Sequence, residues 1–150
     1  MESTLHKPAF VAANGIPKAT TILFWIFTGL FCLEMSFTAY YELLPQGAHA
    51  FTRLGFPSGY FRLELSLAKL VGVAVLLIPK VPARGVIYVM KEWAYAGFAI
   101  NLVSAIIAHL SISDRPLAFV PSTLTSVLWA ASYFFSRRLQ ERPRGQSAVV

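Results

Sequence analysis

One stretch, residues 60–79, constrains the fold more than any other part of the chain. Its sequence is YFRLELSLAKLVGVAVLLIP. It is long enough to cross a bilayer, because about 20 helical residues at ~1.5 Å each span the ~30 Å hydrocarbon core. Lys69 lies close to its middle, and an ammonium there costs at least ~2.5 kcal/mol unless it faces a bundle interior or a wet cavity. The rest of the chain must therefore supply groups that meet Lys69.

The composition indicates a membrane protein. Of 150 residues, 56% are apolar and only 13% are charged, against roughly 25% charged in soluble domains. Four long apolar runs predict an all-α, integral membrane four-helix bundle. The first run begins near Thr21 without a cleavage site after it, so we expect it to remain in the protein. The expected helices are residues 19–44, 60–78, 86–110 and 117–135.

Proline, glycine and charge mark the segments around these helices. The transmembrane domain covers residues 19–136, between a polar N-terminal lead, residues 1–18, and a basic tail, residues 137–150. The connection at residues 45–59 begins with Pro45, which ends the first helix. We expect part of this connection to lie on the membrane surface as a short amphipathic turn.

The distribution of Lys and Arg predicts the orientation of the bundle. Cytoplasmic loops carry an excess of these residues. With both termini in the cytoplasm (N-in/C-in), nine of them lie inside and two lie in the outer loops. The inner residues are Lys7, Lys18, Lys80, Arg84, Lys91, Arg137, Arg138, Arg142 and Arg144, and the outer ones are Arg53 and Arg115.

Several classes of function are excluded or disfavoured by the sequence. The net charge is +6, but topology explains the basic residues better than nucleic-acid binding does. Cys32 is the only cysteine, which excludes an intrachain disulfide, a zinc finger and a cysteine-ligated iron–sulfur cluster. The sequence has no Ser/His/Asp constellation, phosphate-binding loop or GxGxxG motif. We therefore expect no catalytic residues, no metal and, at most, an accessory subunit of an oxidoreductase.

Glu34 is the predicted partner of Lys69. The first helix is expected to leave the membrane near Glu42, and helix rise places Glu34 ~12 Å below that edge. Lys69 lies ~13 Å below Tyr60 at the start of the second helix, so the two depths match. Pairing would avoid an uncompensated charge in the membrane. The alternative is that Lys69 snorkels or bonds to backbone carbonyls, while Glu34 is protonated and hydrogen-bonded elsewhere.

Other polar residues extend this pair into a candidate polar cluster. Glu64 lies off the Lys69 face, and His109 has a suitable depth to meet it unless Glu64 reaches interfacial water. A metal at His109, Glu64 and Asp114 is conceivable, but a lone histidine near a helix end is more often hydrogen-bonded at the interface. Asn101 needs partners or a ligand at its depth. The candidate cluster is Glu34, Glu64, Lys69, Asn101 and His109.

Small residues predict where the helices pack. Ser66 and Gly72 share the Lys69 face of the second helix. The third and fourth helices carry small or polar residues at spacings of three and four, which let backbones approach closely. These residues are Ala94, Gly97, Asn101, Ser104, Ala105 and Ala108 on the third helix, and Ser122, Ser126 and Ala130 on the fourth.

The chain resembles the DoxX-like family of small four-helix membrane proteins over about residues 21–135. The similar segments are GFPSGYF, AKLVGVAVLLIP and KEWAYAGFAINLVSAIIAH. The resemblance implies an integral protein of a bacterial inner membrane. Relatives include subunits of thiosulfate:quinone or quinol-oxidising complexes, membrane partners of oxidant-defence enzymes and assembly chaperones. The motif positions carried over are Lys69, Lys91, Glu92, Trp93, Tyr95, Gly97 and His109.

The segment Lys91-Glu92-Trp93 is expected at the inner interface. Trp93 would anchor the helix there, and Glu92 suits the first turn of a helix. The segment is then either a solvated boundary or a site that docks a partner or a lipid headgroup.

Three functions remain open. The first is a non-catalytic accessory or assembly partner of a membrane redox or stress-response complex. The second is binding of a quinone or another small amphiphile among the first three helices, lined by Glu34, Lys69 and Asn101. The third is a proton or solute pathway through the buried charges. Besides the lipid bilayer, we expect another membrane protein or a second copy of the chain as partner.

Overall fold

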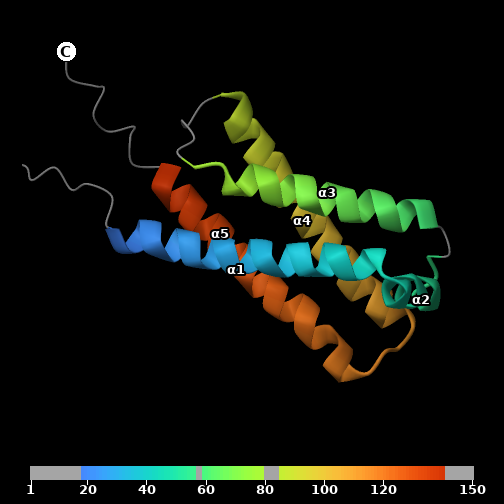
Figure 1. Cartoon of the computed structure of the whole chain (residues 1–150). Helices are drawn as coiled ribbons and strands as arrows, with labels where there is room; N and C mark the ends of the chain where they lie inside the picture. Colours follow the sequence, from blue (N-terminus) through green and yellow to red (C-terminus); the bar gives the residue numbers. More distant parts are fainter. Residues whose placement is uncertain (1–17, 57–58, 80–84, 141–150) are drawn as a thin grey trace, which may run out of the picture.

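The computed structural model describes residues 18–56, 59–79 and 85–140 (Figure 1). All regular elements in these ranges are helical. The expected lead over residues 1–18 and the tail over residues 137–150 lie largely outside the described residues. The helices are α1 Lys18–Leu43, α2 Pro45–Arg53, α3 Gly59–Leu77, α4 Val86–Ser111, the 3₁₀ turn η1 Pro116–Phe119 and α5 Val120–Gln140.

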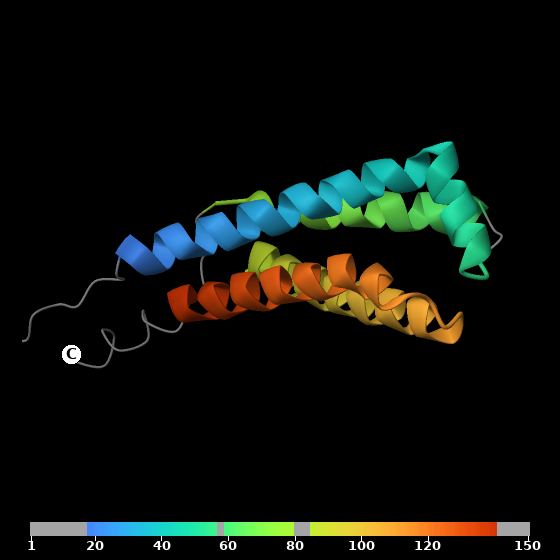
Figure 2. The same ribbon diagram turned by 90° about the horizontal axis from the view of Figure 1, so that it is seen from below.

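The four long helices form two crossed layers. Figure 2 shows α1, α2 and α3 in one layer and α4 and α5 in the other. Helix α1 packs against both α3 and α5, while α4 packs against α3 and α5. The start of α1 and the end of α5 lie at one end of the molecule, here the terminal end (Figure 1). The opposite end carries α2 and the connection from α4 to α5, and is called the α2 end.

Apolar and aromatic side chains fill the space between the layers. Phe31 of α1 is completely buried and meets the Phe98 ring of α4 edge-on, with 5.0 Å between ring centroids. Gly72 of α3 lies against the same ring, because a Cβ there would come within 2.8 Å of it. The remaining core residues are Cys32, Met35, Val73, Leu76, Tyr95 and Leu102.

Three helical segments among the described residues are long and apolar enough to cross a membrane: α1, α4, and the segment Pro116–Gln140 that joins η1 to α5. Four such helices were predicted. Helix α3 does not meet the same criterion, since its 19 residues include Arg62, Glu64 and Lys69. Its ability to span a bilayer depends on how those charges are satisfied.

Two segments differ from the sequence-based expectation. The connection after α1 contains the nine-residue helix α2, where only a surface turn was expected. Helix α5 follows a 3₁₀ turn and continues to Gln140, beyond the expected end at residue 135. Pro121 fits the first turn of α5, where its missing N–H has no helical partner to lose. Arg137 and Arg138 occupy the last turn, where cations interact favourably with the helix dipole.

Candidate functional site

A buried ion pair joins α1 to α3. Lys69 Nζ donates to Glu42 Oε1, and the Ser66 hydroxyl donates to Glu42 Oε2 at 3.0 Å. The Lys69 and Glu42 side chains are only 7% and 11% exposed. Arg62 donates to the carbonyl oxygens of Glu42 and Leu44 at the end of α1. We call Glu42, Arg62, Ser66 and Lys69 the Glu42 cluster. Within it, the charge of Lys69 is neutralised by a carboxylate.

The predicted pairing of Lys69 with Glu34 is therefore wrong. Glu34 instead accepts a hydrogen bond from the Thr125 hydroxyl of α5. Side chains lean toward the N-terminus of their own helix, and α1 and α3 run in opposite directions (Figure 1). Glu42 consequently leans into the bundle while Lys69 leans toward the α2 end, so the two side chains approach each other. Matching the depths of the backbones ignored this lean.

Helix α2 folds back on the end of α1 because Gly47 has no side chain. A Cβ at Gly47 would lie 2.4 Å from the Tyr41 carbonyl oxygen and 2.7 Å from Glu42 Cα. Close contact at this glycine places α2 directly beside the backbone that carries Glu42. Sequence reasoning missed Glu42 as the partner of Lys69, because its position near Pro45 indicates only where the first helix ends.

A second polar group ties α1, α4 and α5 together near the terminal half of the bundle. The hydroxyls of Thr28 and Ser132 are 2.7 Å apart, and the Tyr95 hydroxyl lies 2.8 Å from Ser132. The Trp129 indole donates to the Tyr95 carbonyl at 3.0 Å. Thr28 and Ser132 are completely buried. These hydroxyls satisfy one another, and sequence reasoning missed them because single hydroxyl residues in apolar helices are common.

The fourth-helix packing face predicted at Ser122, Ser126 and Ala130 is also displaced. The buried residues of α5 are Thr125, Ser132 and Ser136.

Lys91 has a structural role that differs from the expected solvated boundary. It is only 7% exposed, and its ammonium donates to the carbonyl oxygens of Leu76 at 3.1 Å and Ile78 at 2.6 Å. The last carbonyls of a helix lack intrahelical partners, and a cation is favourable at that end. Lys91 therefore caps the end of α3 from α4.

The two neighbours of Lys91 face different surroundings. Glu92 lies 3.5 Å from Arg137 and receives a hydrogen bond from the Tyr133 hydroxyl at 3.4 Å, which links α4 to α5. Trp93 is 77% exposed. The three side chains thus have different surroundings, since Lys91 is buried, Glu92 is half-buried and Trp93 is exposed.

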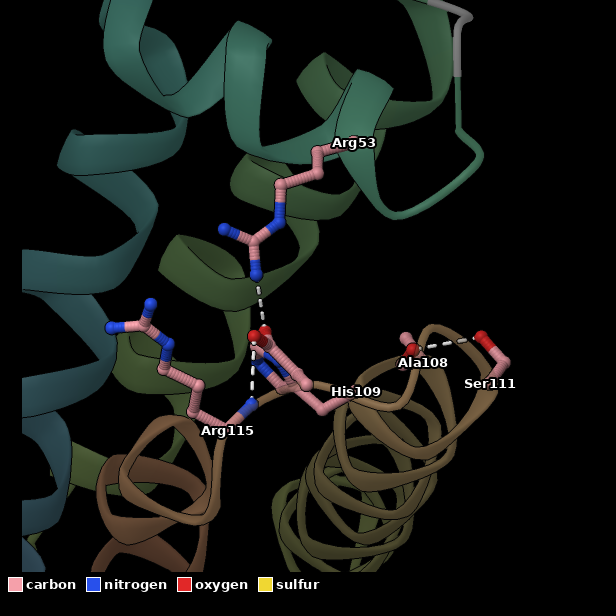
Figure 3. Close-up of polar contacts among 6 residues, drawn as sticks. Arg53, Ala108, His109, Ser111 and Arg115 are labelled. Carbon is pink, nitrogen blue, oxygen red and sulfur yellow. Dashed lines mark hydrogen bonds and ion pairs between the residues drawn. The ribbon is translucent and has the colours of Figure 1, made fainter.

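An ion-pair clasp joins the two layers at the α2 end. Figure 3 shows Arg53 of α2 directed at the connection after α4. Asp114 Oδ2 lies 2.5 Å from the Arg53 guanidinium and 2.9 Å from His109 Nδ1. The Arg115 backbone N–H donates to the other oxygen at 3.0 Å. The His109 hydrogen bond and then the Arg115 N–H lower the pKa of Asp114 below its ordinary value.

The predicted contact of Glu64 with His109 is not formed. His109 is hydrogen-bonded to Asp114 instead, and Glu64 is exposed on α3. Among the described residues, no group of three His, Cys, Asp or Glu side chains could hold a metal ion. The five residues of the predicted polar cluster therefore do not meet, because Glu34, Lys69 and His109 each have a different partner.

A groove of about 980 Å³ lies between α3 and α4. Among its described lining residues, Lys69 is the only charged one and Asn101 carries the only carboxamide. The remainder are apolar, apart from the indole N–H of Trp93. The rim is open, since Val71, Val86 and Trp93 are 63%, 77% and 77% exposed. We call this the α3–α4 groove.

The small residues predicted as a packing face on α4 form part of this groove. Ala94, Gly97 and Asn101 line it, and Ser104 is exposed. The buried face of α4 is instead the adjacent stripe Tyr95, Phe98 and Leu102. The large side chains on that stripe reach the core, whereas the small residues beside it leave space. The expected close helix contact is therefore absent at Gly97. Ala94 does pack against the core, and Ala108 at the other end of the predicted face is buried.

Three apolar helical segments and internally neutralised charges define the class of this molecule as an all-helical integral membrane protein. The chain belongs to the DoxX-like family, whose sequence model matches residues 26–131. This confirms the family predicted from the sequence. The matched range includes the Glu42 cluster, the clasp and the α3–α4 groove. A search of curated proteins and a search of solved structures found no match to this chain.

Proposed function

We propose that this protein binds a small amphiphile in the α3–α4 groove, within a bacterial inner membrane. The observation that carries the proposal is the groove itself. Its volume of about 980 Å³ lies at the upper end of the ~300–1,000 Å³ range that small-molecule sites occupy. Such sites combine a mostly apolar lining with a few polar groups that orient the ligand.

The positions of the polar groups support an amphiphile rather than a simple hydrocarbon. Lys69 and Asn101 both contribute to the groove lining. The Asn101 side chain has no hydrogen-bond partner among the described residues. A carboxamide without a partner in a lipid environment costs free energy, so a ligand that carries a polar head would be favoured beside it.

Small residues on both α3 and α4 leave the space that forms the groove. Ala68 and Gly72 of α3 and Ala94 and Gly97 of α4 all line the groove. A Cβ at Gly97 would have no heavy atom within 4 Å, whereas a Cβ at Gly72 would meet Phe98. Phe98 therefore keeps α3 and α4 apart at one level, and the small residues leave the adjacent space free for a ligand.

The proposal places α3 in the membrane as a fourth span, which completes a four-helix bundle. Its 19 residues are about 28 Å long at ~1.5 Å per residue, close to the thickness of the hydrocarbon core. Neutralisation of Lys69 by Glu42 and the bonds of Arg62 to carbonyls at the end of α1 lower the cost of burying these charges.

An N-in/C-in orientation is favoured by the basic residues at the terminal end. Lys18 begins α1, and Arg137 and Arg138 end α5; cytoplasmic ends carry such an excess. The test replaces Cys32 by Ala and adds either K18C or R115C. A membrane-impermeant maleimide should label R115C in intact spheroplasts and K18C only after lysis. Labelling in the opposite order would refute the orientation.

Filling the groove tests the proposed binding function. G97L would project a side chain into the groove, and G29L is the matched control, since a Cβ at Gly29 of α1 also meets nothing within 4 Å. Each protein would be purified in mild detergent and its bound small molecules identified by mass spectrometry. We expect one amphiphile in near-stoichiometric amount with wild type and G29L, and its loss from G97L. Equal occupancy in G97L and G29L, or bulk phospholipid alone in all three, would refute the proposal.

The open rim of the groove supports a second candidate, an accessory or assembly partner of a membrane redox or stress-response complex. Val86 and Trp93 are strongly exposed beside the small residues of α4, and small residues allow another helix to approach closely. The same purifications separate the two candidates. A stoichiometric membrane protein retained by wild type and G29L but lost from G97L would support this second role.

A further inference from the structure

We infer that the α3–α4 groove selects a neutral ligand whose head accepts hydrogen bonds, and that it rejects anionic and cationic amphiphiles of the same chain length. This inference rests on the proposed function and adds the charge and hydrogen-bonding class of the ligand. Long-chain alcohols, esters and ketones belong to this class. Fatty acid anions, alkyl sulfonates and quaternary ammonium amphiphiles do not.

The ion pair of Lys69 determines this charge preference. Among the described lining residues, Lys69 is the only charged side chain of the groove, and its ammonium is already paired with Glu42. An anionic head near Lys69 would place a second negative charge close to the Glu42 carboxylate. Repulsion between like charges is strong where little water is present. A cationic head would meet the ammonium itself, so both signs of charge are disfavoured.

The free hydrogen-bonding capacity of the groove determines the type of head. Lys69 has three N–H donors, and the described residues use one of them, at Glu42 Oε1. Asn101 has two N–H donors and one acceptor oxygen, with no partner for its side chain among the described residues. The groove thus offers more donors than acceptors. A carbonyl or hydroxyl oxygen can accept from them without carrying a charge.

Burial of Glu42 explains why the ligand does not simply replace it. The Glu42 carboxylate also accepts from Ser66 at 3.0 Å, and the Glu42 side chain is only 11% exposed. Separating Glu42 from Lys69 would leave a buried carboxylate without its cation, which is unfavourable. The pair therefore stays intact when the groove fills.

Trp93 supplies the readout, because it lines the groove and its fluorescence is quenched when a brominated chain touches it. The test uses the variant W25F/W129F, which keeps Trp93 as the only tryptophan, in nanodiscs. Three probes share one brominated chain and differ in the head: alcohol, sulfonate or trimethylammonium. We expect the alcohol to bind about tenfold more tightly than either charged probe. Because Trp129 donates to Tyr95, native mass spectrometry of the wild type with the same probes provides a second readout.

The variant E42Q should remove the preference of the groove for the alcohol over the sulfonate. It leaves Lys69 without a compensating charge, so the sulfonate should gain about tenfold in affinity and bind at least as well as the alcohol. The double variant E42Q/K69M removes both charges and should restore the preference for the alcohol. If E42Q does not fold, the wild-type series alone decides the inference.

The outcomes separate this inference from the function on which it rests. The control for binding is the triple variant W25F/W129F/G97L, in which the groove is filled. If every probe quenches Trp93 equally in W25F/W129F and in this triple variant, the groove binds no amphiphile and both proposals fail. If the probes bind but the sulfonate or the trimethylammonium probe is preferred by wild type, the binding function stands and the neutral-ligand inference is wrong. An unchanged preference in folded E42Q would also refute it, since Glu42 would not then set the selectivity.

Discussion

Replacing Lys69 by Met removes one half of the buried ion pair and leaves the other half in place. The Lys69 and Glu42 side chains are 7% and 11% exposed, so water cannot replace the missing ammonium. Glu42 would keep the Ser66 hydroxyl as its side-chain donor. Breaking a buried pair from one side costs about 3–5 kcal/mol. We expect K69M to lower the free energy of unfolding by this amount, and E42Q to lower it by a similar amount.

The double variant E42Q/K69M removes both charges together. A buried pair replaced by neutral residues of similar volume is often nearly neutral in stability, so we expect the double variant to lie within about 1–2 kcal/mol of wild type. The two single effects should therefore not add, and the coupling energy should be at least about 4 kcal/mol. Reversible unfolding in mixed detergent micelles, followed by circular dichroism, measures all four proteins.

E34Q is the control, because Glu34 meets the Thr125 hydroxyl and not Lys69. An amide oxygen can accept that same hydrogen bond, so we expect E34Q to change stability by less than about 1 kcal/mol. Additive losses in E42Q/K69M, or an effect of E34Q as large as that of E42Q, would refute the assignment of Glu42 as the partner of Lys69.

Three other perturbations test separate contacts. G47A should destabilise the protein by about 1–3 kcal/mol in the same unfolding assay, because its Cβ would collide with the Tyr41 carbonyl oxygen. The control G29A should have no such effect, because its Cβ meets no heavy atom within 4 Å. Equal effects of the two variants would contradict the proposed packing of α2 on α1. K91M should lower the free energy of unfolding by about 1.5–3 kcal/mol, since it removes charged hydrogen bonds to the end of α3. An unchanged free energy of unfolding would show that this cap does not stabilise the fold. The pKa of Asp114 is lowered below its ordinary value of 3.8, so the clasp stabilises the fold above that value and this contribution is lost as pH falls through the folded-state pKa. D114N should therefore weaken the pH dependence of stability below pH 4, and an unchanged profile would exclude the clasp as its source.

The sequence allowed the environment of Lys69 to be predicted, but not its partner. A charge at the centre of an apolar helix requires neutralisation, and the predicted face with Ser66 and Gly72 is the buried one. The partner depends on the lean of side chains along antiparallel helices, which composition does not encode. Glu42 was not predicted as the partner because only two residues separate it from Pro45, where the first helix was expected to end. Only the return of α2 at Gly47 brings that end of α1 into a protected place.

The small-residue stripe on α4 shows a second limit of sequence reasoning. Spacings of three and four correctly identify residues on one helix face, but they do not state whether a neighbour closes against that face. Here Phe98, one position after Gly97, meets Gly72 and occupies the contact between α3 and α4. Gly97 was therefore assigned to packing, although it lines a groove, whereas Ala94 both lines the groove and packs against the core.

The packing of α3 against α4 also determines the role of Lys91, which the sequence did not indicate. A lysine followed by glutamate and tryptophan is typical of a membrane boundary, and nothing local indicates that its ammonium reaches carbonyl oxygens of another helix. That contact depends on where α3 ends relative to α4, which is a property of the three-dimensional packing.

The open rim at Val71, Val86 and Trp93 has a consequence for how affinity must be expressed. A ligand that enters the groove between exposed apolar side chains arrives by lateral diffusion within the membrane. Its occupancy then follows its mole fraction among the lipids, and its aqueous concentration matters only through partitioning. Two ligands with the same intrinsic fit would appear to differ in potency by the ratio of their partition coefficients, and diluting the sample with buffer would leave a strongly partitioned ligand bound.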